Sequence, residues 1–262
     1  MNEKRDKYDG MVETHQIKDA VEKKIKRRRI RYIILTLLVT GAFFALCYHY
    51  LFKVVTVEYS GNSYYSTEEL SQAFGIGTGD KLLSFSKTER EEYLLEKFPY
   101  LAECKIDRII PDKITVTVSE RQAIMYTYVS GKYVIFDKEM YVVELSDTKP
   151  DLIEVRFDES ILIKCVLGDP VVFKDERTGV GLYRLYEALI SSPVYMKTEY
   201  ITVKSRFDYY LNYEDTFEVY LGDSLECPAK LLFLWGIIEK LPQGSSGRID
   251  VSNPTEGYFK EK

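Results

Sequence analysis

The sequence predicts an α+β protein that begins with one membrane-spanning helix. Three observations indicate this fold class. A basic segment is followed by an apolar run without Asp, Glu, Lys or Arg, at residues 32–52. A β-α-α-β-β pattern comes next, and the rest of the chain reads as short strands with two helical patterns. We therefore expect one N-terminal transmembrane helix, a small β-α-α-β-β unit, and a strand-rich mixed β unit with two helices.

The net charge of −5 is the sum of two segments of opposite sign. Residues 1–52 carry eleven Lys or Arg against six Asp or Glu, whereas residues 53–262 carry 25 against 35. Eight of the basic side chains lie between Lys18 and Arg31. Nucleic-acid binding would require aromatic or groove-reading structure beside these charges, which the short tail lacks. We therefore expect no nucleic-acid partner.

Residues 30–52 are expected to form an uncleaved signal anchor. The apolar run has about the 20 residues needed to cross a bilayer, with tyrosines near both of its ends. A buried core helix would be amphipathic, and this run is apolar on every face. A cleaved signal peptide would end in small residues, which residues 50–54 lack. A lipoprotein signal would need a small residue before its cysteine, but Leu46 precedes Cys47.

The basic flank also predicts the orientation of the chain. Positive charge accumulates on the cytoplasmic side of a membrane span. Residues 1–29 are therefore expected to be a cytoplasmic tail, and residues 53–262 are expected to lie on the extracytoplasmic side. This is the topology of a single-pass type II membrane protein.

The first external unit, residues 53–121, is expected to contain three strands and two short helices. Each helix begins with a capping box, in which a serine and a glutamate three residues later bond each other's backbone. Gly75 suits the left-handed end of the first helix. Val55, Val57 and Tyr59 are expected to share one strand face. The boxes are Ser66 with Glu69 and Ser86 with Glu89, and the strands are residues 55–59, 101–108 and 113–120.

The second unit, residues 122–253, is expected to be a mixed β domain. Its first strand would place Ile124, Tyr126 and Tyr128 on one face. Helical spacing predicts helices over residues 180–191 and 228–241, and residues 254–262 are a short tail. The remaining strands are expected at residues 123–129, 132–136, 140–145, 152–157, 161–166, 200–204, 209–213, 217–221 and 247–251.

The composition offers little for catalysis. The two histidines are His15 in the tail and His49 at the end of the span, so Ser-His pairs, Cys-His pairs and His-ligated metals are excluded from residues 53–262. The glycine-rich run 75–81 leaves a helix and lacks the Lys-Ser/Thr of a phosphate loop. Cys104, Cys165 and Cys227 form no C-x-x-C pair. We therefore expect that the protein is not an enzyme and that it binds no cofactor, metal or small-molecule substrate.

Several short strings in the first unit together resemble a POTRA domain, and the order of the whole chain is similar to the bacterial division proteins of the FtsQ/DivIB family. The resemblance covers nearly all of residues 30–253, and the last strand of the β unit resembles the family's closing strand. The strings are Ser60-Gly61-Asn62, Gly75–Leu82, Phe98-Pro99-Tyr100-Leu101, Arg108–Pro111 and Ile114–Arg121.

The resemblance implies a non-enzymatic scaffold of the division septum. Its expected partners are division proteins of the FtsB/DivIC and FtsL type, together with septal penicillin-binding synthases. In the family the last strand takes up a strand of the FtsB/DivIC partner, and we expect residues 247–251 to form an open edge because nothing long follows them. The corresponding residues are Ile249, Asp250, Val251, Gly257, Tyr258 and Phe259.

Two alternatives stay open from the sequence. Pro254 would interrupt a backbone ladder, so Tyr258 and Phe259 can equally belong to a frayed tail. The second functional hypothesis is a POTRA-bearing receptor or secretion component that binds extended polypeptides by strand addition. Such a factor is expected to carry tandem POTRA units or a barrel, for which residues 122–262 leave no room.

Overall fold

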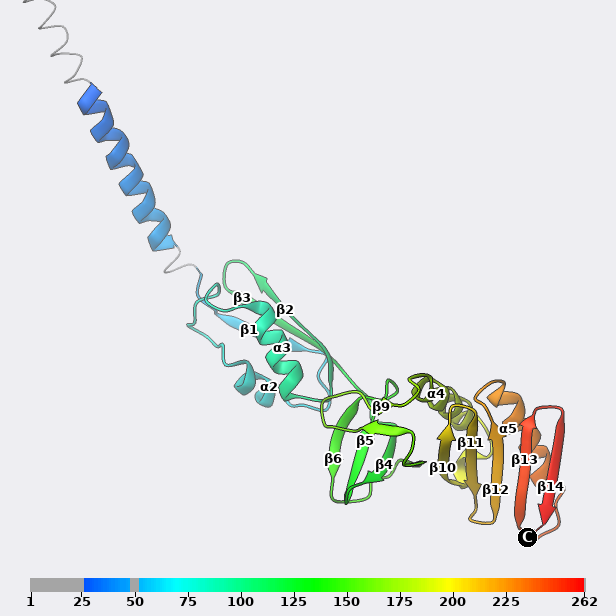
Figure 1. The fold of residues 1–262 in the computed structure, drawn as a ribbon. Coiled ribbons are helices and arrows are strands. Elements are labelled where there is room, and N and C mark those ends of the chain that lie inside the picture. Colours follow the sequence, from blue (N-terminus) through cyan, green and yellow to red (C-terminus); the bar gives the residue numbers. More distant parts are fainter. Residues whose placement is uncertain (1–25, 48–51, 262) are drawn as a thin grey trace, which may run out of the picture. The chain divides into compact units, whose positions relative to one another are not determined.

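The computed structural model describes residues 26–47 and 52–261 (Figure 1). The described chain divides into two compact units. One comprises residues up to Glu58, the loop 76–85 and the hairpin tip 107–115. The other comprises residues 59–75, 86–106 and 116 onward.

The predicted anchor is a helix over Lys26–Cys47. Its 22 residues have a mean hydropathy of 2.1 in the most apolar window, and none of that window is buried against the rest of the chain. At 1.5 Å per residue the helix is about 33 Å long, which is enough to cross a bilayer. The helix therefore has the length and apolar surface of a membrane span.

The β-α-α-β-β unit forms as the sequence predicts. Its strands pair in the order β1-β3-β2, and Leu70, Phe74 and Leu94 of its helices are buried. Val54 is buried and Val55 is 58% exposed, so the expected strand face of Val55, Val57 and Tyr59 is wrong at its first position, because β1 begins only at Thr56. The elements are β1 (Thr56–Ser60), α2 (Thr67–Phe74), α3 (Lys87–Lys97), β2 (Leu101–Ile109) and β3 (Lys113–Glu120).

The first predicted capping box is complete. The Ser66 hydroxyl accepts from the backbone N–H of Glu69, and the Glu69 carboxylate accepts from the backbone N–H of Ser66 at 2.9 Å. These contacts lower the pKa of Glu69. Gly75 ends α2 in the left-handed region, at φ 66°. Local sequence signals therefore set both ends of this helix.

A nine-stranded sheet dominates the rest of the chain. Its order is β14-β13-β12-β11-β10-β7-β4-β5-β6, in which β7 pairs parallel with both β10 and β4. The strands are β4 (Met125–Val129), β5 (Lys132–Phe136), β6 (Val142–Ser146), β7 (Ile153–Phe157), β10 (Thr198–Ser205), β11 (Asp208–Tyr213), β12 (Phe217–Gly222), β13 (Gly247–Asn253) and β14 (Glu256–Glu261).

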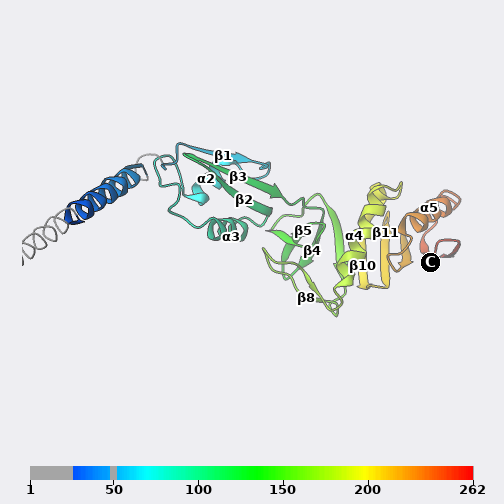
Figure 2. The ribbon, with the colours of Figure 1, turned by 90° about the horizontal axis from the view of Figure 1, so that it is seen from above.

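Two helices cover one face of this sheet (Figure 2). Leu182, Leu185 and Leu189 of α4 (Arg177–Ile190) pack with Leu231 and Leu234 of α5 (Cys227–Ile238) in the main core. The sheet side of that core is formed by Val203, Leu211, Val219 and Ile249. Helical spacing of leucines in the sequence therefore identifies the helix surfaces that bury the sheet.

Around β4 the sheet is buried on both faces. Met125 and Ile124 belong to the main core, whereas Tyr126 belongs to a second cluster with Tyr100 and Ile135. The expectation that Ile124 shares a face with Tyr126 and Tyr128 is therefore wrong, because Ile124 precedes the strand.

Three short elements were not expected from the sequence. They are β9 (Val172–Phe173), the 3-10 turn Tyr195–Lys197, and β14. The expected strand 161–166 is shortened to β8 (Leu162–Lys164), which pairs with β9 as a small hairpin. Of the three unexpected elements, β14 changes the interpretation of the site.

Candidate partner-binding hairpin

Strand β13 lies inside the sheet and is not its edge. It pairs parallel with β12 on one side and antiparallel with β14 on the other. Ile249 and Val251 have no exposed surface, because both side chains enter the main core. The expectation that residues 247–251 form an open edge is therefore wrong: the chain that follows covers them.

Gly247 permits the close approach of the two strands. A side chain at Gly247 would collide with the carbonyl oxygen of Lys260, which lies on the neighbouring strand. Only glycine lacks the Cβ that would meet this oxygen. Strand packing within this chain therefore explains why Gly247 begins the closing Gly-Arg-Ile-Asp-Val string, without reference to any partner.

Pro254 lies in the turn and interrupts no ladder. Asn253 pairs with Glu256, so Pro254 and Thr255 form a two-residue connection between β13 and β14. The Asn253 side-chain oxygen accepts from the backbone N–H of Thr255 at 3.0 Å and from its hydroxyl at 2.9 Å. Proline presets the backbone angle that the second position of a turn requires. The frayed-tail interpretation of the chain end is wrong for the same reason.

Strand β14 is the terminal strand of the sheet, and every residue in it is exposed. Ile249 pairs with Phe259, and Asp250 pairs with Tyr258. The ring of Phe259 contacts that of Phe217 with the centroids 6.1 Å apart. The structure thus brings all six residues predicted for partner binding into one hairpin, with Gly257, Tyr258 and Phe259 on its outer strand.

Gly257 lies directly against helix α5. A Cβ at this position would lie 2.7 Å from side-chain atoms of both Phe233 and Ile237. The absence of a side chain therefore allows β14 to lie flat against the helix. Adjacent residues of a strand point to opposite faces, so Tyr258 projects to the face that carries no helix.

That helix-free face carries a row of tyrosines with Arg248 beside it. Tyr210 pairs with Tyr220, Tyr220 with Asp250, and Asp250 with Tyr258 across four successive strands. The guanidinium of Arg248 lies 5.7 Å and 5.6 Å from the ring centroids of Tyr210 and Tyr220. Sequence reasoning missed these neighbours, although the alternation in each strand places them opposite the buried residues.

Hydrogen bonding fixes part of this row. The Tyr220 hydroxyl donates to the Asp208 carboxylate at 3.0 Å. Burial and this hydrogen bond both raise the pKa of Tyr220, so the ring stays neutral at physiological pH. The row therefore offers amphipathic rings beside the cationic side chains of Arg248 and Lys204 and the carboxylate of Asp250, which is a surface suited to contacting another polypeptide.

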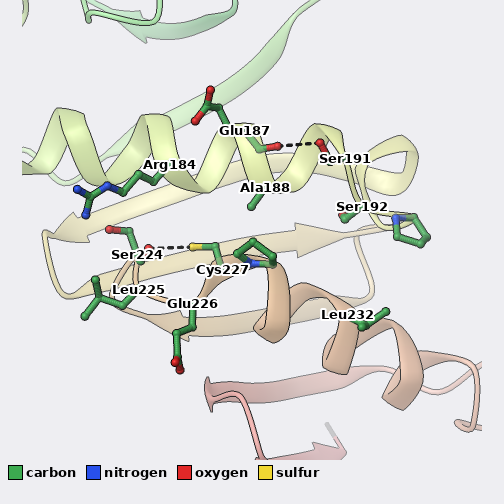
Figure 3. Close-up of a pocket in the computed structure, with 12 residues that line it drawn as sticks. Arg184, Glu187, Ala188, Ser191, Ser192, Ser224, Leu225, Glu226, Cys227 and Leu232 are labelled. Carbon is green, nitrogen blue, oxygen red and sulfur yellow. Dashed lines mark hydrogen bonds between the residues drawn. The ribbon is translucent and has the colours of Figure 1, made fainter.

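A hollow lies between the N-terminus of α5 and the C-terminal half of α4 (Figure 3). It measures about 660 Å³ and includes Glu187, Cys227 and Leu232. The Cys227 thiol donates to the Ser224 carbonyl oxygen at 3.3 Å, and burial raises its pKa to about 11. A thiol held protonated in this way is a poor nucleophile.

Among the described residues, none of those around this hollow forms a metal-binding group. No set of three or more His, Cys, Asp or Glu within residues 26–47 and 52–261 is arranged to hold a metal ion. His15 and His49 lie outside the described residues. Burial raises the pKa of Cys104 and Cys165 to about 11 as well. The hairpin with its exposed strand is therefore the better candidate site.

Comparison with known proteins identifies similar proteins along most of the chain. Residues 52–121 match the family profile described as POTRA domain, FtsQ-type. The cell division protein DivIB of Clostridium botulinum strain Loch Maree is 24% identical over 250 residues, which is 91% of this chain and 94% of that protein. DivIB of Clostridium tetani is 22% identical over 224 residues, which is 84% of this chain and 82% of that protein.

Two further similarities cover less of this chain. DivIB of Clostridium botulinum strain Hall is 26% identical over 156 residues, which is 59% of this chain and 60% of that protein. A solved structure of the major extracytoplasmic domain of DivIB from Geobacillus stearothermophilus aligns over 47% of this chain and 99% of that chain. Its sequence identity is 18% and its TM-score is 0.30, a similarity too low to support an argument about the fold.

Proposed function

Because this chain belongs to the FtsQ/DivIB family of cell division proteins, we propose that it is a non-enzymatic scaffold of the bacterial division complex. It holds single-span division proteins of the FtsB/DivIC and FtsL type, together with septal penicillin-binding synthases, at the division site. The helix Lys26–Cys47 anchors it in the membrane, with residues 1–29 in the cytoplasm and residues 53–262 outside.

The observation that carries the proposal is the exposed terminal strand β14. A strand that ends a sheet has one row of backbone N–H and C=O groups without a strand partner, and an extended segment of another protein can pair with it. All six residues of β14 are exposed, and the strand pairs on its inner side with β13, whose Ile249 and Val251 are buried. A partner strand added here would extend the sheet and place its own side chains beside Tyr258 and Phe259.

The sheet has a second terminal strand, β6, which is differently equipped. Its first two residues, Val142 and Val143, are buried, whereas no residue of β14 is. The row of tyrosines with Arg248 borders β14, whereas β6 is bordered by Tyr133, whose ring packs against those of Tyr126 and Tyr128. These features favour β14 as the binding edge.

Proline substitution on β14 tests the proposal. Neighbouring residues of an antiparallel strand direct their N–H groups to opposite sides, so one of Tyr258 and Phe259 donates toward the open edge. Introducing Tyr258→Pro and Phe259→Pro in turn should therefore abolish co-purification of a partner in at least one variant. Leu145→Pro in β6 is the matched control at the other edge and should retain capture.

Two readouts make this experiment decisive. Circular dichroism verifies that the variants keep the sheet, and cross-linking in membranes identifies the captured proteins. Undiminished capture by both β14 variants would refute the edge assignment. A fluorescent fusion that gives a uniform membrane signal without a mid-cell band in dividing cells would refute the division role.

A further inference from the structure

We propose that the membrane-proximal tip of the first unit, formed by residues 52–55, 81–85 and 108–112, inserts exposed aliphatic side chains into the surface of the bilayer that the anchor spans. The proposal rests on the single-span anchorage described above. It does not depend on which side of the membrane the unit occupies or on which division partner binds.

Backbone hydrogen bonds join the three segments of this tip. The N–H of Leu82 donates to the carbonyl of Phe52 at 3.0 Å, and the N–H of Val54 donates to the carbonyl of Asp80 at 2.8 Å. The N–H of Val55 donates to the carbonyl of Asp112 at 2.7 Å. The loop and the β2–β3 hairpin tip are thus fixed to the residues where the chain enters the unit (Figure 1).

A side-chain contact closes the remaining gap between loop and hairpin. The guanidinium of Arg108 lies 4.3 Å from the ring centroid of Phe85 and donates to the Phe85 carbonyl oxygen. The arginine therefore bridges the hairpin to the loop and holds the residues that follow it in place.

The tip exposes four aliphatic side chains. Ile110 is 67% exposed, Val55 58%, Ile109 48% and Leu83 44%. Single exposed apolar residues are common, but four gathered on joined segments mark an interaction surface.

The covalent chain keeps this surface at the membrane. Five peptide steps separate Cys47, the last described residue of the anchor helix, from Phe52, which limits the distance between their Cα atoms to about 18 Å. The uncharged run itself extends from residue 32 to Phe52, so Phe52 lies at or near the bilayer boundary. The joined segments cannot move far from the lipid headgroups, whatever the direction of the rest of the unit.

Charge does not supply the attraction. Residues 52–58, 76–85 and 107–115 carry four cationic and four carboxylate side chains. One pair of these, Lys113 and Glu58, forms an ion pair at 2.6 Å. The surface should therefore bind through its aliphatic side chains, with little dependence on anionic lipid or on salt.

Quenching by brominated lipid tests the insertion. The full chain carrying Trp235→Phe would be placed in nanodiscs at one chain per disc, with Ile110→Trp as the reporter. Lipids brominated near the headgroup end of their acyl chains should quench this reporter strongly, and added salt should leave the quenching unchanged. Tyr128→Trp, at an exposed position on β4, should stay unquenched.

Neighbouring variants and an anchor reporter separate the possible failures. Leu83→Ser combined with Ile109→Ser should weaken the quenching of the Ile110→Trp reporter. Leu145→Ser should not, although Leu145 is 43% exposed, close to the 44% of Leu83.

Phe43→Trp reports on the anchor itself. Strong quenching there without quenching at Ile110→Trp would overturn the docking and leave the anchorage intact, whereas no quenching at either would overturn both. Shielding of Ile110→Trp only in discs with two chains would assign the surface to self-association and overturn the lipid proposal.

Discussion

The ammonium group of Lys230 lies 2.9 Å from the carboxylate of Asp223, and only 3% of the Lys230 side chain is exposed. The same ammonium donates to the Asp223 carbonyl oxygen at 3.0 Å. Burial is the largest single influence and opposes ionisation of Asp223, but the hydrogen bonds from Lys230 and from the Leu225 N–H, together with the charge of Lys230, outweigh it and lower the pKa of the carboxyl group. This pair fixes the loop between β12 and α5, whose residues 224–226 line the hollow of Figure 3.

Replacing Asp223 and replacing Lys230 should change the stability of the chain by unequal amounts. Asp223→Ala leaves a buried ammonium without its counter-charge and should destabilise the chain by about 2 kcal/mol, because Asp223 is itself partly exposed. Lys230→Met replaces the charge with an apolar chain of similar length and should be close to neutral. Thermal unfolding in nanodiscs measures both, and equal losses in the two variants would contradict this account.

Two helical glycines should respond to alanine with opposite signs. A Cβ on Gly181 would collide with the Tyr209 hydroxyl and lie 2.9 Å from the Ser224 side-chain oxygen, whereas Gly236 has nothing within 4 Å. Gly236→Ala should stabilise the chain by about 0.5–1 kcal/mol through helix propensity. Gly181→Ala should lower the melting temperature, since the Tyr209 hydroxyl would have to leave the Thr178 carbonyl oxygen that it now bonds. A stabilising Gly181→Ala would show that the helix α4 packs less closely than described.

Stability should fall at alkaline pH because of buried tyrosines. Burial and the hydrogen bond to Glu144 at 2.8 Å raise the pKa of Tyr100 above its ordinary value. The folded chain therefore retains a proton that the unfolded chain loses, so this contribution is complete below about pH 10 and is lost as the pH rises further. Tyr100→Phe should be less stable at pH 8 and should show a shallower alkaline decline, measured by urea unfolding against pH. Tyr128→Phe, at an exposed position, is the control, and an equally shallow decline there would remove Tyr100 as the cause.

Filling the space at Gly257 should loosen β14. Gly257→Ala places a methyl group against Phe233 and Ile237, which must then move. Hydrogen exchange across residues 256–261 should accelerate, and partner capture should weaken with it. Thr255→Ala, in the turn beside it, should leave partner capture largely intact, because Asn253 still accepts from the backbone N–H at that position. Unchanged exchange in Gly257→Ala would show that α5 does not constrain this strand.

The sequence predicted the order of elements well wherever local signals were strong. Paired serine and glutamate caps, the uncharged run and the leucine spacing of α4 each act within a few residues, so they could be read without tertiary information. The strand face of Ile124 was mistaken because the strand was expected to begin at residue 123, whereas β4 begins at Met125, so Ile124 precedes the strand and does not follow its alternation.

The sheet edge could not be located from the sequence for a different reason. Residues 256–261 carry no buried side chain, so no hydrophobic pattern marks them as a strand. Their signal was the Asn253-Pro254 turn, which was interpreted as an interruption when it is the connection of a hairpin. The six residues predicted for partner binding nonetheless lie together, because the hairpin pairs its two strands, and their role in binding stays a prediction.

Site-specific photo-cross-linking in dividing cells tests the central claim, that β14 is the edge to which a division partner adds a strand. A photoreactive amino acid would replace Tyr258 on β14 and, as the control, Leu145 on β6 at the opposite edge. The account predicts that the probe at position 258 cross-links to a single-span division protein and that the probe at position 145 does not. Cross-links from position 145 alone, or from neither position in cells where the protein is at the septum, would contradict it.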